Sequence, residues 1–477
     1  MLSRRSFCKS GAATALLSSS VATGMSKRRQ PNFVVILADD LGYGDIGSFG
    51  SPNIMTPRID RLVAEGLKLT CVYAEPFCGP ARASIMTGSY PIRVAEPGNL
   101  KHRHTVLHLR ESTIAEVLKP AGYRSAMIGK WGIGVQSNNN WRRDLQPLRQ
   151  GFDYYFGTPA SNDTPEDVVL LEGDGETVEF PARLDTLTGR YADAAIRFMR
   201  ENRDNPFFVY LCPNMPHVAL AASQQFRGKS KRGLFGDVVE EIDFHVGRIV
   251  DEIRRLCLEN DTYVIFTSDN GPWNVKESDG GSAGPFRGGK SSIWEGGVRV
   301  PGVVWGPGRV SANSVSSEMV GLQDFLPTLA SLAGAKVPPD VGTDGYDLSD
   351  FWLGYSDKSP RNTFAYYLWA HLQAVRQGQW KLHLPRPKDP EWLAPFTPSS
   401  HLAPEDAIAV SQPMLFNIET DYAERWNVAD DNPKIVAELF ELAEEFRAEL
   451  GDYNRMGSGV RLYDPYKQRP SRPVLVP

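Results

Sequence analysis

The 477-residue chain is 41% hydrophobic and 23% charged, the balance of an ordinary soluble globular protein. Its formal net charge of −5 argues against a nucleic-acid partner, because binding to phosphates needs a concentrated basic face. The five cysteines are scattered and form no CxxC pair, so we expect at most one disulfide and no zinc site.

The first 30 residues predict an export signal and linker. Segment 3–9 reads SRRSFCK, and a weakly apolar run of small residues follows to about Gly24. This pattern is typical of a twin-arginine signal, with a disordered basic tail as the alternative. No other stretch approaches ~18 uninterrupted apolar residues, so we expect no membrane span in the mature chain. The translocase would be a transient partner, and the mature protein would be periplasmic or extracellular.

Four short apolar runs predict buried strands of a mostly parallel sheet. They cover residues 32–38, 124–128, 206–211 and 262–267. Such runs are too short for helices and too apolar for surface strands. In sheets of this kind, ligands bind beyond the carboxyl ends of the strands. The polar residues that follow these runs are therefore expected to meet in one site.

Helices are expected between these strands, over residues 58–65, 113–121 and 239–256. Thr56 would cap the first helix with Pro57 at its start, and Thr113 would form a capping box with Glu116. The third helix is amphipathic, with apolar residues at helical spacing that would cover the sheet. The alternation of strands and helices indicates an α/β fold with helices flanking the sheet.

The alternation fades after about residue 355, which predicts a smaller second unit. Short strands near residues 366–382 and a helix over 433–450 indicate a C-terminal antiparallel sheet with a packed helix. We therefore expect an N-terminal signal and linker over 1–30, a catalytic α/β domain over 31–355 and a smaller α+β subdomain over 356–477.

Two acidic pairs follow predicted strands. Asp39 and Asp40 come after the first strand, and Asp269 and Asn270 come after the strand that ends at residue 267. Their hard oxygen atoms suit calcium or magnesium and not zinc. Each pair alone is also compatible with a helix cap or a surface turn. Because both follow strands of one sheet, together they favour a metal site.

The segment Gly42–Gly47 matches the dinucleotide fingerprint GxGxxG and follows a predicted strand. Its context excludes that function. The carboxylates of Asp39 and Asp40 would repel a pyrophosphate, and the following residues, SFGSP, cannot begin the helix that should hold the phosphate.

The segment Cys78–Gly88, which reads CGPARASIMTG, resembles the signature of the sulfatase family. That signature is Cys-x-Pro-(Ser or Ala)-Arg followed by Thr-Gly, and the family converts its cysteine to formylglycine. The resemblance extends from about Pro31 to His383, with an echo at Leu415–Asp421. It implies an alkaline-phosphatase-like α/β domain, a bound calcium ion and a sulfuric ester hydrolase. It also implies a transient partner, the formylglycine-generating enzyme.

The resemblance also implies roles for particular residues. The calcium ligands would be Asp39, Asp40, Asp269, Asn270 and the modified Cys78, with magnesium as the alternative ion. Arg82, which stands one turn after Cys78 if a helix starts at the motif, would orient the formylglycine and the carboxylates. The catalytic and substrate-binding groups would be Lys130, His217 and Lys290, together with Ser161. His217 or Lys290 would protonate the leaving alcohol.

The family chemistry explains these residue types. A serine attacking sulfur would leave a stable sulfate ester on the enzyme, whereas a hydrated aldehyde attacks with one hydroxyl and expels sulfate with the other. One position departs from the family pattern: most relatives have a histidine where this chain has Gly132. That histidine is thought to deprotonate the second hydroxyl, and losing a general base typically costs ~10²–10⁴ in rate.

Two other functions stay open beside a glycan sulfatase. A phosphonate or phosphate ester hydrolase would use the same formylglycine, because the site binds tetrahedral anions in general. A sulfated-glycan-binding protein with impaired turnover is suggested by Gly132. His102, His104 and His108 are candidates to replace the missing histidine or to contact an acidic glycan, although a polar loop is the simpler interpretation.

Overall fold

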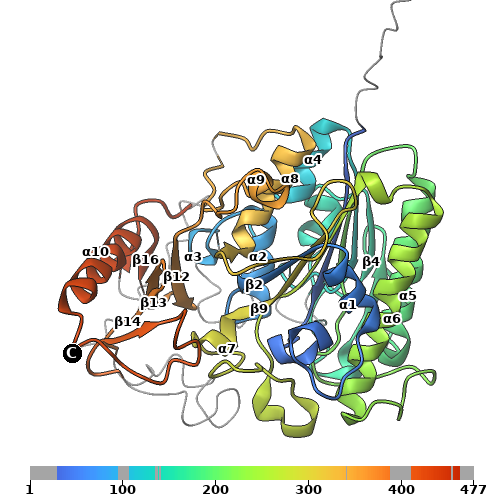
Figure 1. Cartoon of the computed structure of the whole chain (residues 1–477). Helices are drawn as coiled ribbons and strands as arrows, with labels where there is room; N and C mark the ends of the chain where they lie inside the picture. The colour runs from blue at the N-terminus through green and yellow to red at the C-terminus, as the bar shows by residue number, and fades with distance from the viewer. Residues whose placement is uncertain are drawn as a thin grey trace, which may run out of the picture.

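The computed structural model describes residues 29–94, 107–134, 138, 141–339, 341–386, 410–452 and 455–461. Its described part contains an eleven-stranded mixed sheet with helices on both faces and a smaller antiparallel sheet at one end (Figure 1). The expected export signal, residues 1–28, lies outside the described residues. Within the described part, no helix is both long and apolar enough to cross a bilayer.

Four adjacent parallel strands form the centre of the large sheet, in the order β8-β1-β7-β3. Their bounds are β1 Asn32–Ala38, β3 Arg124–Gly129, β7 Phe207–Cys212 and β8 Thr262–Ser268. The prediction of four buried strands is confirmed. Each strand lies within a residue or two of its expected bounds, because the apolar runs fill the centre of the sheet.

The edges of the large sheet were not predicted. On one side lie β2 (Leu67–Tyr73), β9 (Arg299–Trp305), β10 (Ser314–Ser316) and β11 (Val320–Gly321); on the other lie β4 (Tyr154–Gly157), β5 (Leu170–Glu172) and β6 (Glu176–Glu179). Strand β9 runs antiparallel to both β8 and β2, so the sheet is mixed.

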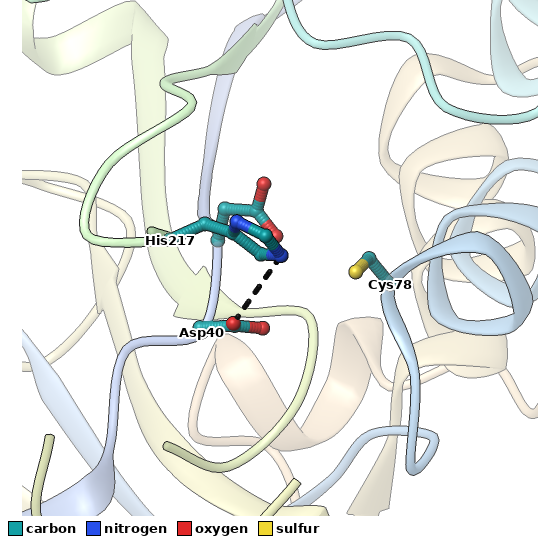
Figure 2. A group of neighbouring side chains, drawn as sticks. Asp40, Cys78 and His217 are labelled. Atoms are coloured by element: carbon teal, nitrogen blue, oxygen red, sulfur yellow. Dashed lines mark ion pairs between the residues drawn. The ribbon is translucent and has the colours of Figure 1, made fainter. Parts of the chain in front are cut away.

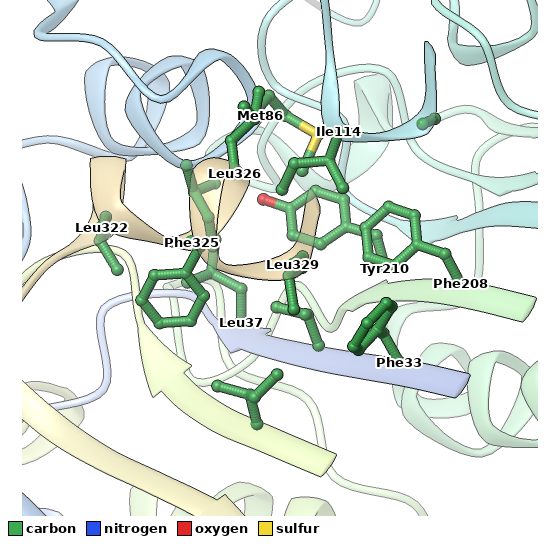
Figure 3. Packing of buried hydrophobic residues seen from close by; sticks show 14 of the residues in the cluster. Phe33, Leu37, Met86, Ile114, Phe208, Tyr210, Leu322, Phe325, Leu326 and Leu329 are labelled. Atoms are coloured by element: carbon green, nitrogen blue, oxygen red, sulfur yellow. The ribbon is translucent and has the colours of Figure 1, made fainter. Parts of the chain in front are cut away.

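Alternate residues of β1 face two separate cores. Phe33 and Leu37 pack on the face covered by α2 (Cys78–Thr87), α4 (Ile114–Leu118) and α8 (Phe325–Ala333), as Figure 3 shows. Val34 and Ile36 pack on the opposite face, under α1 (Pro57–Ala64), α5 (Leu184–Glu201) and α6 (Gly233–Arg255). The period of two along a strand sends successive side chains to opposite faces, which accounts for its uniformly apolar sequence.

The predicted caps of two helices had different outcomes. The capping box at α4 is confirmed: Thr113 N donates to Glu116 at 2.9 Å, and Glu116 N donates to the Thr113 hydroxyl at 3.3 Å. The cap of α1 by Thr56 is wrong, because its side chain accepts no cap hydrogen bond. Instead, the carboxylate of Asp243 on α6 accepts from the backbone N–H groups of Arg58 and Ile59.

The C-terminal residues form the expected antiparallel sheet and helix. The sheet contains β12 (Thr363–Leu368), β13 (His371–Gln377), β14 (Trp380–His383) and β15 (Met414–Asn417), in that order, and α10 (Pro433–Leu450) packs on it. Shorter elements are α3 (Pro91–Val94), α7 (Glu295–Val298), α9 (Ser349–Trp352), β16 (Gly451–Asp452) and β17 (Arg455–Met456). The predicted fold class is confirmed, whereas the boundary at residue 355 stays a prediction.

Candidate active site

The central strands bring the predicted polar residues together. Asp39 and Asp40 follow β1, and Asp269 and Asn270 follow β8, its direct neighbour. Lys130 follows β3 on the other side. Because these strands are parallel, their carboxyl ends meet at one edge of the sheet. This is the site that the sequence predicted beyond the strand ends.

Cys78 enters this site from a different element. It is the first residue of α2, which confirms that a helix starts at the motif. Ligand atoms of Asp39, Asp40, Cys78 and His217 all lie within 4.8 Å of one another. Figure 2 shows the Cys78 sulfur directed toward His217 and Asp40. The sequence interpretation placed His217 at the sulfate and not among the metal ligands, so its position in this cluster is new.

Arg82 is fully buried and links three parts of the site. Its Nη2 donates to Asp269 Oδ2 at 2.8 Å, and its Nη1 donates to the carbonyl of Lys130 at 2.8 Å. The same Nη2 lies 3.8 Å from Asp39 Oδ1. A guanidinium suits this position, because its planar fork presents several donors in a fixed geometry. Arg82 therefore orients the carboxylates that follow β1 and β8.

Two lysines pair with the carboxylates that follow β1. Lys130 Nζ lies 2.6 Å from Asp39 Oδ2, and Lys290 Nζ lies 2.8 Å from Asp40 Oδ2. Burial alone would raise the pKa of Asp39, but the charges of Lys130, His217, Arg82 and Lys290 outweigh it and hold that pKa well below its ordinary value. Asp39 is therefore ionised despite being fully buried.

The oxygen atoms of the site fit a hard divalent cation. Asp39 Oδ1 and Asn270 Oδ1 are buried and accept no hydrogen bond from the described residues. Burial and the neighbouring Asp39 carboxylate raise the pKa of Asp269 to about 7. Asp40 has a φ of 63°, uncommon for a residue other than glycine, and its N–H donates to Asp269 Oδ1 at 3.1 Å. Crowded carboxylates with unpaired oxygens are what a calcium or magnesium ion would satisfy.

The Cys78 thiol is a poor nucleophile as it stands. Burial raises its pKa to about 12, although the charges of Lys130 and Lys290 act in the opposite direction. A thiol must ionise to attack, and a reactive cysteine normally has a lowered pKa. The four cysteines among the described residues, Cys78 included, form no disulfide with one another. Thiolate chemistry at Cys78 is therefore disfavoured.

His217 lies between two carboxylates at the end of the site. Its Nε2 is 3.6 Å from Asp40 Oδ2 and 3.7 Å from Asp163 Oδ1. Burial and the charge of Lys290 lower the pKa of His217, while the carboxylates of Asp40, Asp39 and Asp163 raise it. The Nδ1 atom contacts the carbonyl of Val218. This contact leaves Nε2 as the ring atom that faces the site.

Sequence reasoning missed two residues of the site. Asp163 is half-exposed beside His217, and the hydroxyl of Ser161 donates to its carboxylate. Among the described residues, the side chain of the predicted Ser161 thus reaches the cluster through Asp163, two residues later in the same segment. Trp273 lies under Lys290, whose Nζ is 4.5 Å from the ring centroid. In the sequence, Trp273 is marked as a site residue only by its position three residues after Asn270.

Gly132 has a backbone that favours glycine. Its φ is +74°, and a Cβ built there would lie 3.0 Å from Cδ of Arg82. Of the three histidines considered as substitutes, His102 and His104 lie outside the described residues. The Nδ1 of His108 accepts a hydrogen bond from the N–H of Arg110, two residues away. The backbone at 132 is thus adapted to the residue that is present.

Comparison with known proteins agrees with this geometry. A sulfatase family model matches residues 31–335, and a model of the C-terminal region of aryl-sulfatase matches residues 359–472. The chain is 38% identical over 382 residues to the N-acetylgalactosamine-6-sulfatase of Rattus norvegicus, covering 74% of this chain and 71% of that protein. It is 36% identical over 458 residues to the arylsulfatase A of Homo sapiens, covering 88% and 89% respectively.

Solved structures give the same result. The crystal structure of the PsFucS1 sulfatase from Pseudoalteromonas sp. matches with a TM-score of 0.77 and 26% identity, covering 88% of this chain and 90% of that one. The fold and site therefore define a hydrolase with an alkaline-phosphatase-like α/β domain. The chain belongs to the sulfatase family and is a sulfuric ester hydrolase.

Proposed function

We propose that this sulfatase removes sulfate from glycans, with a formylglycine made from Cys78 and a bound calcium ion. The proposal depends mainly on the environment of Cys78. Cys78 is the first residue of α2, and its sulfur lies within 4.8 Å of ligand atoms of Asp39, Asp40 and His217. Burial raises the pKa of its thiol to about 12. A cysteine in a cationic site that resists ionisation is useful there only after conversion to another group.

The cation would be held by Asp39, Asp40, Asp269, Asn270 and the modified Cys78, with His217 close by. When bound, calcium or magnesium would neutralise sulfate oxygens and lower the pKa of a coordinated hydroxyl. The unpaired oxygens of Asp39 and Asn270 support this ligand set. Arg82 would stabilise this ligand set, because its Nη2 donates to Asp269 Oδ2 at 2.8 Å and so fixes the position of that carboxylate.

The remaining site residues would bind sulfate and move a proton. A formylglycine would supply, as its hydrate, a hydroxyl nucleophile and a second hydroxyl for releasing sulfate. Lys130 and Lys290 place two ammonium groups beside the carboxylates, where they would attract sulfate oxygens. Nε2 of His217 faces the site and would exchange a proton with the leaving alcohol. Ser161 would contact the substrate or hold Asp163 in place.

A glycan substrate is supported by the relatives. One is named for a sulfated amino sugar, N-acetylgalactosamine 6-sulfate, and it matches 74% of this chain at 38% identity. The particular sugar and the sulfated carbon depend on the loops around the site. We therefore propose the class, sulfate esters of glycans, and leave the sugar to a substrate panel.

Peptide mass spectrometry across Cys78 tests the mechanism. In a host that installs formylglycine, the peptide is expected to have the mass of the aldehyde, and Cys78→Ala should abolish release of sulfate. Cys257→Ala is a suitable control, because Cys257 is an exposed cysteine outside the site. An unmodified thiol in a protein that still releases sulfate would contradict the role of formylglycine.

Parallel rate measurements on aryl sulfate, phosphate and phosphonate esters test the substrate class. We expect the sulfate ester to be hydrolysed fastest. Turnover of the phosphorus esters alone would instead favour the phosphonate or phosphate ester hydrolase. Release of sulfate from a panel of sulfated sugars would then identify the natural substrate.

A binding protein with impaired turnover is the second candidate, because Gly132 replaces a family histidine. Tight binding of sulfated glycan without sulfate release would favour it. Installing histidine at residue 132 is a poor rescue experiment, because φ is +74° and a side chain there would meet Arg82. Single-turnover kinetics of the unchanged protein, which separate attack from release, give the clearer answer.

We also propose export through the twin-arginine translocase, on the basis of residues 3–9 and the apolar run after them. The formylglycine-generating enzyme would act first, since this route carries folded proteins. Replacing Arg4 and Arg5 by lysine should retain the protein inside the cell. Equal export of both forms would contradict the signal.

A further inference from the structure

A second pocket lies apart from the active site, at the junction of the large sheet and the C-terminal sheet. It has a volume of about 410 Å³, and none of the active-site residues lines it. Its lining combines two arginines, three aromatic rings and one carboxylate: Arg299, Arg376, Tyr43, Phe286, Tyr422 and Glu419. We call it the junction pocket.

Arg376 is buried at the base of this pocket with part of its guanidinium unpaired. It is only 5% exposed. Its Nε donates to the carbonyl of Gly378 at 2.7 Å, and its Nη1 donates to the Tyr73 hydroxyl and contacts the Cys71 sulfur at 3.4 Å. Among the described residues, no partner accepts from Nη2. A buried guanidinium with an unused donor edge is well suited to bind an anion.

Arg299 offers a second such edge. Its Nε donates to the carbonyl of Thr70 at 2.8 Å, and its Nη1 lies 3.3 Å from Glu295 Oε2. Its Nη2 donates to no described residue. The guanidinium carbon lies 4.7 Å from the centroid of the Phe286 ring, which is a cation–π contact within the pocket lining. Both arginines of the lining therefore have an unpaired donor edge.

The charges around the pocket are equal in number. Glu295 pairs with Lys381 at 3.0 Å as well as with Arg299, and Glu424 pairs with the same lysine at 3.0 Å. With Arg376 these residues make three cations and two carboxylates, and Glu419 of the lining is the third carboxylate. An anion would therefore be bound by the free donor edges of Arg299 and Arg376, and not by an excess of positive charge.

The rim of the pocket fits a sugar ring. Phe286 packs edge-to-face against Tyr43 at 4.7 Å and against Tyr422 at 6.2 Å. Tyr422 is 48% exposed, so part of its side chain is open to solvent. Aromatic faces stack against the apolar faces of sugars, and the exposed carboxylate of Glu419 can accept hydrogen bonds from hydroxyls. A volume of about 410 Å³ accommodates one or two sugar units.

We propose that the junction pocket binds an acidic sugar, with Arg299 and Arg376 holding its anionic group and the aromatic rim holding the ring. The junction pocket lies apart from the active site, and binding of the sugar does not depend on the proposed function, whereas its arrival on a sulfated polymer does. The sugar would arrive either as a unit of the polymer whose sulfate is cleaved or as a free monosaccharide.

Calorimetric titration with galacturonic acid tests the proposal, because this sugar carries a carboxylate and no sulfate ester. We expect galacturonic acid to bind. Galactose, which lacks the anionic group, should bind at least about tenfold more weakly. Tyr422→Ala and Arg299→Gln should each weaken the binding by about tenfold or more. Tyr355→Ala is the matched control, since Tyr355 is exposed and lies outside the pocket.

Two further measurements complete the test. If the sugar is part of the polymer, Tyr422→Ala raises KM for a sulfated acidic polymer and leaves hydrolysis of a small aryl sulfate unchanged. If the natural ligand is a free sugar, Tyr422→Ala weakens the binding of galacturonic acid by the same factor, and KM for the polymer is unchanged. The proposal is overturned if galacturonic acid binds no better than galactose, or if Tyr422→Ala binds galacturonic acid as tightly as the unchanged protein does.

Discussion

Arg82 shows how one buried side chain organises an active site. It donates to Asp269 and to the carbonyl of Lys130, and it lies close to Asp39. The side chains of Asp269, Lys130 and Asp39 are inaccessible to solvent or nearly so. The ionisation of each of these groups therefore depends on the charges of the others. Such a group positions other residues around Cys78 and does not itself need to react.

Arg82→Ala should destabilise the fold by about 3–5 kcal/mol, because it leaves the carboxylates of Asp269 and Asp39 buried without their partner. Urea unfolding would measure the loss. Arg82→Lys is the control: it keeps the charge but not the fork, so stability should recover in part while activity stays low. A loss below about 1 kcal/mol for Arg82→Ala would show that the pair is not structurally important.

Gly132 and Gly122 form a natural comparison at the same scale. Both have positive φ, +74° and +88°, but a Cβ at 132 would lie 3.0 Å from Cδ of Arg82, whereas a Cβ at 122 would meet nothing within 4 Å. The backbone cost of alanine should therefore be similar at the two positions, and only residue 132 adds a steric contact.

Gly122→Ala should cost about 1 kcal/mol, and Gly132→Ala should cost about 1–2 kcal/mol more and reduce sulfatase activity by moving Arg82. Thermal unfolding and initial rates would measure both effects. Equal losses in the two variants would contradict the steric contact. Activity that rises in Gly132→Ala would contradict the positioning role of Arg82.

Helix α1 shows how an element can depend on a distant one. Its first N–H groups are capped by Asp243, which lies on α6, and not by the local Thr56. Burial raises the pKa of Asp243 to about 7, against 3.8 for the free side chain, although the hydrogen bonds from Ile59 and Arg58 lower it. Asp243 therefore keeps its proton up to a higher pH in the folded state than in the unfolded state.

The sign of the resulting pH dependence follows. Between about pH 4 and pH 7 the folded protein keeps a proton that the unfolded chain has lost, so stability falls as pH rises through this window. The slope for one proton is at most about 1.4 kcal/mol per pH unit. Asp243→Asn keeps an oxygen acceptor for the cap and does not titrate.

We therefore expect Asp243→Asn to become more stable relative to the unchanged protein as pH rises from 5 to 7, and the difference to level off above pH 7. Urea unfolding at several pH values measures this. Asp251→Asn is the control, because Asp251 lies on the same helix but is exposed. Parallel stability curves for Asp243→Asn and the unchanged protein would contradict the raised pKa.

At the scale of the whole molecule, the large and small sheets share one core. One hydrophobic cluster contains Tyr73 and Tyr90 from the main domain and Phe364 and Leu382 from the C-terminal sheet. The C-terminal chain is also tied to α8, because the guanidinium of Arg361 makes two bonds of 2.7 and 2.6 Å to the Asp324 carboxylate. The two units are therefore expected to unfold together.

Arg361→Met should destabilise the whole molecule by about 3–5 kcal/mol, in a single unfolding transition, because Asp324 stays buried without its cation. Lys358→Met is the matched control, since Lys358 pairs with Glu318 at 2.8 Å but is exposed, and its loss should cost less than about 1 kcal/mol. Two separate transitions in Arg361→Met, with the main domain unchanged, would contradict the shared core.

The sequence by itself predicted the centre of the sheet and the capping box at Thr113. These features depend on local signals: apolar runs of strand length and a short capping pattern. It also predicted that Asp39, Asp40, Asp269 and Asn270 would meet, because parallel strands align their carboxyl ends. The sulfatase signature at Cys78–Gly88 is likewise local, so it indicates the family without reference to the fold.

Only the tertiary structure decided the features that join distant segments. Asp243 replaced Thr56 as the cap of α1, Asp163 and Trp273 joined His217 and Lys290, and Arg299 and Arg376 met at the junction pocket. In each case the partners are far apart in the chain, and no spacing rule connects them. Short-range patterns fix which elements form and where ligands can bind, whereas the packing of those elements fixes which side chains pair and how their charges balance.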